Sequence, residues 1–437
     1  MKKFIVSLFV MIAAAAASAS AQDWPNIYGP TSDSKSTEKG ILREWPENGP
    51  EVLWRTGVGI GYGGPVIMDN KVYLLDRDRD KGEDVMRSFD LKTGEELWRY
   101  AYAAPGEVQF PGSRSVPATD GKYVWSCGQN GDLYCFDIKK QTPVWNTNIW
   151  TSFGGTRLPI WAVSQCPLLY KDMVIVLSGA PEAGLVAYDK LTGEIRWKTE
   201  RLGPETYASP TVVTIDGEEQ INIVISSTNP IGHRGDPIEK GRCVGVDPAT
   251  GKVLWSYDNW ECHISSSPVT EVGDNKLLIV GGYERGATMI QVNKTDDGYD
   301  VKELYTTLNF GDHTKAALYV DGYLYGQHTN NSRRDGLVCM DTDGNVMWKT
   351  GREILFDKGS MIYVDGVILA TDGKTNLYVI EPSPEAFKPL AKAALLSEAE
   401  GGNRGMFSSG NWAPIALSKG KLLIRNDKEM LCVKVGK

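Results

Sequence analysis

The sequence is poor in histidine and has no excess of positive charge. It contains four histidines, and 47 Lys and Arg residues against 55 Asp and Glu residues give a formal net charge of −8 over 437 residues. Proteins that bind nucleic acid present a basic patch or stripe, so this balance argues against a nucleic-acid partner. It also argues against purely electrostatic binding to an anionic membrane.

Long apolar runs are absent except at the start of the chain. Lys2 and Lys3 precede an apolar run from Phe4 to Ala17, and Ala19-Ser20-Ala21 has the small residues of a cleavage site. We expect residues 1–21 to be a secretory signal peptide and the protein to be periplasmic or secreted. A membrane anchor is the less favoured alternative because the run is short for a span. We expect no transmembrane segment elsewhere, and no cysteine near the cleavage site offers a point for a lipid.

Sequence signatures of common enzymes and metal sites are also missing. There is no Gly-x-Ser-x-Gly, Walker or Rossmann pattern, and no His-x-x-x-His or Cys/His finger spacing. His263 and His313 could bind a metal together only if the fold joined them, and we expect no metal site. The alternating run Asp76–Asp80 is typical of a solvated loop rather than of a calcium loop.

A repeat is the strongest positive feature. The pattern small-x-Asp-x-x-Thr-Gly-x-x-x-Trp occurs at 187–197, 88–98 and 245–255, and diverged copies occur at 135–145 and 339–348. A period of roughly 40–60 residues in a β-rich chain is typical of propeller blades. We expect each Trp to pack over the neighbouring blade, with Tyr305 replacing it in one degenerate copy.

The starts of the innermost strands give the number of blades. Proline suits the first residue of a strand, where its missing N–H need not join the ladder. Six small-residue/Pro pairs and two starts without Pro mark eight positions: Gly64-Pro65, Val116-Pro117, Cys166-Pro167, Ser209-Pro210, Ser267-Pro268, Lys315-Ala316, Gly359-Ser360 and Ala413-Pro414. Asp-Gly and Asp-Asn hairpin turns follow several of them. The sequence therefore predicts an all-β, eight-bladed β-propeller with four-stranded blades.

The two ends of the repeat region complete each other. Val52-Leu53-Trp54 matches the end of a repeat that has no beginning, and Met430–Val433 is a repeat that stops before its Trp. We expect the N-terminal strand to close the last blade, which removes exposed sheet edges. The propeller then spans 51–437. Residues 22–50, rich in Pro and Gly, are expected to be an irregular surface segment wrapped on it, and a helical turn is expected near 385–397.

The seven cysteines divide into two groups. Cys135, Cys339 and Cys432 occupy the small-residue position of the repeat, so we expect them to be buried apolar residues of inner strands. The sequence leaves open whether Cys127, Cys166, Cys243 and Cys262 form disulfides, although an odd total leaves at least one thiol free.

The repeat resembles the tryptophan-docking motif of the PQQ-like (pyrroloquinoline quinone) repeat propellers, over essentially all of residues 50–437. That family includes quinoprotein alcohol dehydrogenases and the assembly factor BamB. The resemblance implies an eight-bladed propeller. Quinoprotein dehydrogenases usually carry two adjacent cysteines beside the quinone, and no Cys-Cys dipeptide exists here. BamB is usually a lipoprotein, and this signal lacks the lipid-attachment cysteine. No functional residue is therefore carried over from either subgroup.

The unusual side chains are expected on one face of the propeller. Loops between second and third strands, and between blades, lie on the face opposite the short Asp-Gly and Thr-Gly turns, and all four histidines belong to them. Such clustering at a channel mouth is typical of a binding site. The candidate ligand-binding residues are Arg114, Arg157, Trp161, Tyr207, His263, Lys315, Lys358 and Trp412.

Two classes of function follow, and a third is weaker. The favoured interpretation is a binding or scaffold module for a protein or polysaccharide-type ligand on this face, without a cofactor. The alternative is a PQQ-dependent alcohol or sugar dehydrogenase, with PQQ and calcium, in which Arg114, Lys315 and Trp161 hold the quinone. Asp312 and His313 are the candidate catalytic residues of a hydrolase or lyase. Asp312 with Lys315, and Asp357 with Lys358, could instead be ion pairs of a wet channel.

Overall fold

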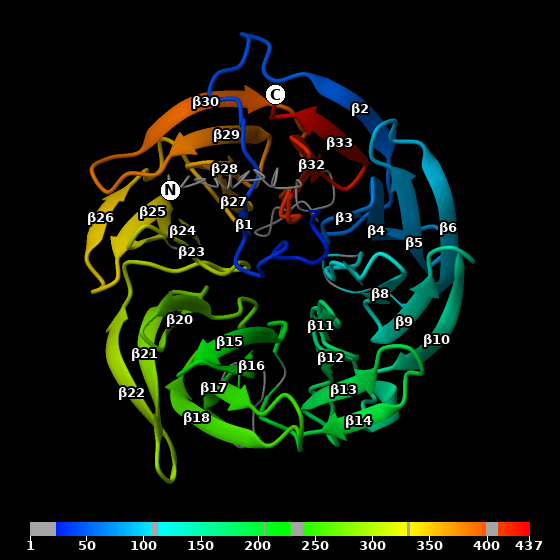
Figure 1. The fold of residues 1–437 in the computed structure, drawn as a ribbon, viewed down its shortest axis with the longest axis vertical. Coiled ribbons are helices and arrows are strands. Elements are labelled where there is room, and N and C mark those ends of the chain that lie inside the picture. Colours follow the sequence, from blue (N-terminus) through cyan, green and yellow to red (C-terminus); the bar gives the residue numbers. More distant parts are fainter. Residues whose placement is uncertain are drawn as a thin grey trace, which may run out of the picture.

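The protein forms a ring of eight β-sheets around a central channel (Figure 1). The structure is a computed structural model that describes residues 23–106, 108, 110, 112–204, 206–228, 239–329, 333–398 and 410–437. Seven sheets have four strands and one has five. The predicted fold class, an eight-bladed propeller with four-stranded blades, is confirmed. In the described residues we find no helix with the length and apolar character that a membrane crossing requires.

The first four blades follow one another along the chain, each starting at the channel and ending at the rim. Blade 1 contains β3 (Val66–Met68), β4 (Lys71–Asp78), β5 (Glu83–Asp90) and β6 (Glu96–Ala103), and blade 2 contains β7 (Ala118–Thr119), β8 (Tyr123–Cys127), β9 (Asp132–Asp137) and β10 (Thr142–Asn148). After the 3-10 helix η1 (Thr151–Phe153), blade 3 contains β11 (Leu168–Tyr170), β12 (Met173–Leu177), β13 (Leu185–Asp189) and β14 (Ile195–Lys198). Blade 4 contains β15 (Thr211–Ile215), β16 (Glu218–Ile225), β17 (Gly241–Val246) and β18 (Val253–Trp260).

The remaining blades include the two that depart from this scheme. Blade 5 contains β19 (Thr270–Gly273), β20 (Lys276–Gly281), β21 (Gly286–Thr295) and β22 (Gly298–Thr307), and blade 6 contains β23 (Leu318–Val320), β24 (Tyr323–Thr329), β25 (Arg334–Asp341) and β26 (Val346–Lys349). Blade 7 contains β27 (Met361–Val364), β28 (Val367–Thr371), β29 (Asn376–Glu381) and β30 (Lys388–Ala394), with β1 (Lys35–Ser36) as a fifth strand. Blade 8 contains β31 (Ala416–Ser418), β32 (Lys421–Arg425), β33 (Glu429–Lys434) and β2 (Val52–Gly57).

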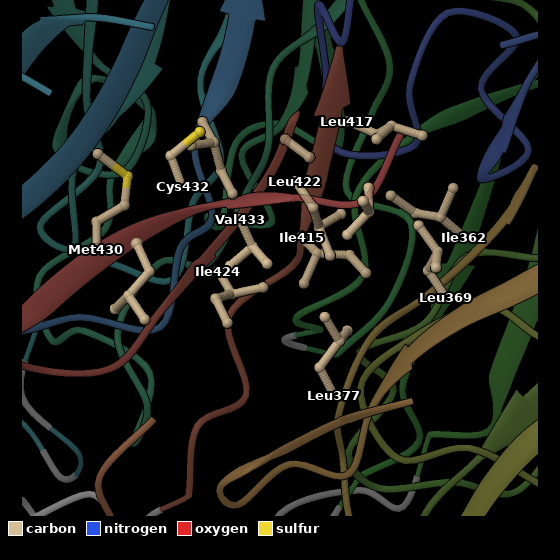
Figure 2. Packing of buried hydrophobic residues seen from close by; sticks show 14 of the residues in the cluster. Ile362, Leu369, Leu377, Ile415, Leu417, Leu422, Ile424, Met430, Cys432 and Val433 are labelled. Atoms are coloured by element: carbon tan, nitrogen blue, oxygen red, sulfur yellow. The ribbon is translucent and has the colours of Figure 1, made fainter. Parts of the chain in front are cut away.

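The ring closes as the sequence predicts. β2 pairs antiparallel with β33, so that Trp54 lies opposite Cys432 (Figure 1). Apolar side chains fill the space between blades 7 and 8, where Ile362, Leu369 and Leu377 pack with residues of blade 8 (Figure 2). The last blade is thus made from two distant parts of the chain.

Aromatic side chains of the outer strands join neighbouring blades. The Trp54 indole N–H donates to Leu91 O at 3.0 Å, and a Cβ built at Gly94 would lie 2.5 Å from the Trp54 ring. The same contact between a ring and the glycine of the next blade recurs in the pairs Trp145–Gly193, Trp197–Gly251 and Tyr305–Gly344. Trp255 differs, because its indole donates to Gln220 Oε1 within its own blade at 2.6 Å.

The lead-in does not simply wrap the surface; it enters the channel. Trp24 is 1% exposed and exchanges two backbone hydrogen bonds with Ile67 of the innermost strand β3. β1 then pairs in parallel with the innermost strand β27 and lies near the centre of the ring (Figure 1). Burial of Trp24 and Tyr28 explains this path, because the channel offers apolar walls that the outer surface lacks.

Two local expectations are wrong. The segment predicted to contain a helical turn, 385–397, instead contains β30, which supplies the fourth strand of blade 7. The run Asp76–Asp80 is not a solvated loop. It begins within β4, where Asp76 is 0% exposed and Arg77 is 4% exposed. Arg87 pairs with Asp76 at 2.8 Å and Arg77 pairs with Asp84 at 3.1 Å, so partners compensate the buried charges.

All seven cysteines are free and buried. Cys135, Cys339 and Cys432 lie on the third strands of their blades, as the repeat predicts. The question left open for Cys127, Cys166, Cys243 and Cys262 is thereby answered, since none is bonded to another. Burial raises the pKa of the Cys243 thiol to about 12, which makes it unreactive.

Candidate functional site

The candidate residues lie where the chain enters each innermost strand and where second strands turn into third strands. Strand alternation puts both kinds of segment on the same face of the ring, around the mouth of the channel. Two groups of side chains form there. We call them the Trp412 cluster (Tyr62, Phe110, Arg114, Lys358 and Trp412) and the Tyr283 cluster (Trp161, Tyr207, His263, Tyr283 and His313).

The Trp412 cluster combines three rings with two cations. The Tyr62 ring stacks on Trp412 with centroids 5.2 Å apart, and Phe110 lies 5.8 Å from Trp412. The Arg114 guanidinium lies 5.7 Å from the Tyr62 ring centre, and Lys358 Nζ lies 5.1 Å from that of Trp412. Both distances allow cation–π attraction. Burial lowers the pKa of Arg114 to about 10, which leaves it charged at neutral pH.

The Tyr283 cluster is built around one tyrosine. Tyr283 lies 4.8 Å from His263, 4.7 Å from His313 and 6.2 Å from Trp161, as measured between ring centres. Trp161 in turn packs at 5.2 Å from Tyr207. Burial, with a smaller effect of the neighbouring Lys358 and Lys315, lowers the pKa of His313 to about 3. His313 is therefore neutral at physiological pH.

Lys315 binds the Trp412 cluster through the backbone of Trp412. Its Nζ donates to Trp412 O at 3.0 Å and to Thr314 Oγ1 at 3.1 Å. Burial lowers the pKa of Lys315 to about 8, although Asp312 opposes this shift. Lys358 pairs with the adjacent Asp357. The predicted pair of Asp357 and Lys358 therefore exists, whereas Lys315 bonds neutral oxygens.

Both carboxylate oxygens of Asp312 accept hydrogen bonds from backbone N–H groups. Asp312 is 1% exposed, Oδ1 accepts the N–H groups of Thr314 and Lys315 at 3.0 Å each, and Oδ2 accepts that of Gln327 at 3.1 Å. Burial raises its pKa to about 6. The carboxylate holds the entry to β23 in place, and the catalytic role proposed for Asp312 and His313 stays a prediction.

The other predicted residues lie outside the clusters. Arg157 is exposed on the segment between η1 and Trp161. His328 is the penultimate residue of β24, on the same face, and lies 3.2 Å from Asp335; burial lowers its pKa to about 4. His233 and Arg234 fall outside the described residues.

Comparisons with known proteins place the chain in a family. A family model described as outer membrane protein assembly factor BamB matches residues 81–350. The chain belongs to this PQQ-like repeat family. The structure of BamB from Moraxella catarrhalis is similar to this PQQ-like propeller with a TM-score of 0.57 and 11% identity, over 88% of this chain and 99% of that one. A europium-containing methanol dehydrogenase is similar with a TM-score of 0.62 and 12% identity, over 92% and 89% of the two chains.

Curated relatives are quinone-dependent alcohol dehydrogenases. The quinohemoprotein alcohol dehydrogenase of Comamonas testosteroni is 24% identical over 47% of this chain and 34% of its own length. The dehydrogenase subunit of the quinone alcohol dehydrogenase of Komagataeibacter europaeus is 27% identical over 31% of this chain and 19% of its own length. The PQQ-like propeller thus matches 34% and 19% of the lengths of these two relatives, and the likeness in structure establishes the fold alone.

Sequence reasoning missed two residues of the clusters, Tyr283 and Phe110. Tyr283 lies in the hairpin between β20 and β21, where Tyr283 and Glu284 both have positive φ, 51° and 65°. A Cβ at Gly282 would lie 2.7 Å from the His313 ring, so glycine is needed for the histidine to approach. The Gly281-Gly282 pair before an aromatic residue is the signal that could have identified this loop.

In the described residues, the mouth presents ring faces and cations beside a small cavity. A cavity beside Tyr62, Trp412 and Arg425 holds about 10 Å³, too little for a ligand. In the part of the chain that the structure describes, no three His, Cys, Asp or Glu side chains gather as a metal site would require. The arrangement suits contact with a surface or a protruding group.

Proposed function

We propose that this PQQ-like propeller is an exported binding module that takes a protein ligand at the channel-mouth face. The observation that carries the proposal is the convergence of aromatic rings and cations from separate blades in the two clusters. Tyrosine, tryptophan and arginine dominate the energetically important positions of protein interfaces. The relatives named for BamB agree with such a role.

The ligand is expected to present an acidic group. Arg114 and Lys315 bring positive charge to the mouth of a chain whose net charge is −8, whereas Lys358 is paired with Asp357. An acidic side chain could bind Lys315 while a neighbouring apolar group packs on Trp412 or Trp161. A polysaccharide-type ligand with acidic sugars is the alternative occupant of the same surface.

Site-specific photocrosslinking in producing cells tests the proposal. A photoreactive residue at Ile160, which is 67% exposed beside Trp161, should form a discrete adduct with one protein. The matched control is the same residue at Leu191, 47% exposed on a Thr-Gly turn of the opposite face, which should not form it. Trp161→Ala should lower the yield at position 160 at least threefold, while Leu191→Ala should not change it.

Three outcomes would contradict the proposal: equal adducts at both positions, no adduct at position 160, or a yield insensitive to Trp161→Ala. Binding of the purified protein to acidic oligosaccharides, measured by calorimetry and lost in Trp161→Ala, would instead support the glycan alternative.

A quinone-dependent oxidoreductase is the second candidate, favoured by the names of the curated relatives. Arg114, Lys315 and Trp161 suit an anionic planar molecule. The calcium that accompanies PQQ does not fit, because calcium takes six to eight oxygen ligands. Both oxygens of Asp312 already accept hydrogen bonds from backbone N–H groups. In the described residues, no cluster of acidic side chains gathers that could supply the remaining ligands. Retention of quinone absorbance after gel filtration with PQQ and calcium, with dye reduction on alcohols or sugars, would favour this candidate over the binding module.

A further inference from the structure

A cavity lies at the other end of the channel, away from the two clusters. It holds about 800 Å³ and is bounded by the lead-in at 28–35 and by the innermost strands of blades 3 to 6. Tyr170 and Lys171, at the turn after β11, belong to its wall, which places it on the face of the short hairpin turns. This volume is within the range of ligand sites, roughly 300–1,000 Å³.

At this end of the channel, the lead-in forms backbone hydrogen bonds with the edges of inner strands of other blades. β1 pairs in parallel with β27, and Tyr363 N–H donates to Ser34 O at 3.0 Å. Trp24 exchanges hydrogen bonds with Ile67 of blade 1, and Thr119 N–H of blade 2 donates to Pro25 O at 2.9 Å. The lead-in therefore satisfies inner edges of blades 7, 1 and 2 in the way that an added strand does.

The cavity borders the inner strand edges of the blades with which the lead-in does not pair. β11, β15, β19 and β23 are each the terminal strand of their sheet, so one edge of each faces the channel. On β15, Thr214 N–H donates to Glu271 Oε2 at 3.0 Å rather than to β16. Because backbone groups alternate along an antiparallel strand, the N–H of Val212 also points away from β16, toward the cavity.

We propose that this cavity binds an extended peptide segment of a partner protein, which adds a strand to the channel-facing edge of β15. The occupant is continuous with the interface that the lead-in already makes on blades 7, 1 and 2. β15 has five residues, so the added strand spans about 17 Å at about 3.4 Å per residue. Leu169 and Val212 line the wall together with Lys171, Glu219 and Glu271 of mixed sign, which favours an uncharged segment with β-branched residues.

A labelled peptide tests the proposal on the mature protein. The probe is an acetylated Thr-Val-Thr-Val-Thr-Val hexapeptide with a C-terminal fluorophore, and binding is measured by fluorescence anisotropy. The matched probe carries N-methyl groups at alternate residues, which removes backbone donors and keeps every side chain. We expect the first peptide to bind with sub-millimolar Kd, and the N-methylated peptide to bind at least tenfold more weakly.

Two substitutions locate the site. Val212→Pro removes the N–H that faces the cavity without removing a hydrogen bond to β16, and should weaken binding at least tenfold. Val212→Ala keeps the N–H and should change Kd less than threefold. Hydrogen exchange of residues 211–215 should slow when the peptide binds.

The outcomes separate clearly. Failure of the hexapeptide to bind at 1 mM overturns the proposal, and so does equal binding of the N-methylated peptide. If Val212→Pro does not fold, the comparison of the two peptides and the hydrogen exchange still decide. Because the site lies away from Trp161, the Trp161→Ala variant should bind the hexapeptide normally, which separates this proposal from the function proposed above.

Discussion

At the residue scale, the surroundings of His313 favour its neutral form. Its ring packs edge-on to Tyr283, and Gly282 leaves just enough space for it. With Lys315 and Lys358 nearby, a second positive charge there would be repelled. The neutral imidazole therefore acts as a packing element of the Tyr283 cluster at physiological pH.

We predict that His313 makes the fold sensitive to acid. A histidine whose pKa falls from about 6.5 in the unfolded chain to about 3 in the folded one takes up a proton on unfolding. Its contribution to stability is therefore complete above pH 6.5 and is lost progressively as the pH falls toward 3. Between pH 7 and pH 4.5, the wild type should lose about 2 kcal/mol more unfolding free energy than His313→Gln. Urea denaturation at both pH values checks this, and parallel losses would contradict it.

Individual residues were the least predictable level. The histidines and Trp161 stand out in the sequence because their side chains are rare and polar or large, but Tyr283 is one of 19 tyrosines. Asp76 and Arg77 resemble a solvated run, because alternating charge does not reveal that Arg87 and Asp84 lie opposite as partners. Burial of a charge depends on contacts across strands, which spacing along the chain does not encode.

At the element scale, the joint between blades is the feature that the repeat encodes. In the four ring–glycine pairs described above, the glycine has positive φ and forms the turn between third and fourth strands, as Gly94 does at φ 73° beside Trp54. The glycine thus has two reasons to be there, the backbone conformation and the close approach of the indole.

We predict that Gly94→Ala lowers the unfolding free energy more than Gly217→Ala does, because an indole ring approaches Gly94 but not Gly217. Gly217 has φ 78° and no atom within 4 Å of a built Cβ, so alanine there should cost only the strain of positive φ, about 1 kcal/mol. At Gly94 the methyl group would also meet the Trp54 ring at 2.5 Å, which should add about 1–3 kcal/mol. Chemical denaturation measures both losses, and equal losses would show that the indole does not press on Gly94.

Elements were largely predictable because their signals are local. Proline pairs marked the starts of innermost strands, and β3 indeed begins directly after Pro65. β30 was missed because its Ala-rich sequence has helical propensity, while the neighbouring strand β29 and the gap in blade 7 impose an extended conformation. Tertiary pairing overrides propensity in that segment.

At the scale of the whole molecule, one strand pair holds the ring closed. β2 lies on the outer edge of blade 8, and Val58 N–H donates to Lys428 O at 2.8 Å just beyond the pair. Alternation along the strand then places the N–H of Thr56 in the ladder and the N–H of Arg55 at the open edge.

We predict that proline at these two neighbouring positions has unequal effects. Thr56→Pro removes a ladder hydrogen bond from the closing pair and should lower the unfolding free energy by about 3 kcal/mol. Arg55→Pro leaves the ladder intact and should lose only the exposed pair with Glu429 and the side-chain hydrogen bond to Leu395 O, about 1–2 kcal/mol. Thermal unfolding of both variants is the measurement, and a smaller loss for Thr56→Pro than for Arg55→Pro would mean that β2 does not close the ring.

The number of blades was predicted from the starts of the innermost strands and ring closure from two complementary fragments of one repeat, but the path of the lead-in was not predicted. Residues 22–50 contain no repeat, and the channel into which Trp24 and Tyr28 pack exists only after eight blades have assembled. The cavity beside the lead-in could not be predicted for the same reason. The function is harder still to predict from the sequence, since propellers of the same fold bind different kinds of ligand.

The joining of β2 to β33 also sets an order for biogenesis. A ribosome makes Trp54 long before Cys432, so blade 8 stays incomplete until β31, β32 and β33 have been made. Until β2 and β33 pair, the free edge of β33 and the uncovered indole of Trp54 are both open to misassociation. A chain interrupted before β33 would lack the partner of β2, and it would fold as an open arc of blades rather than as a smaller closed ring.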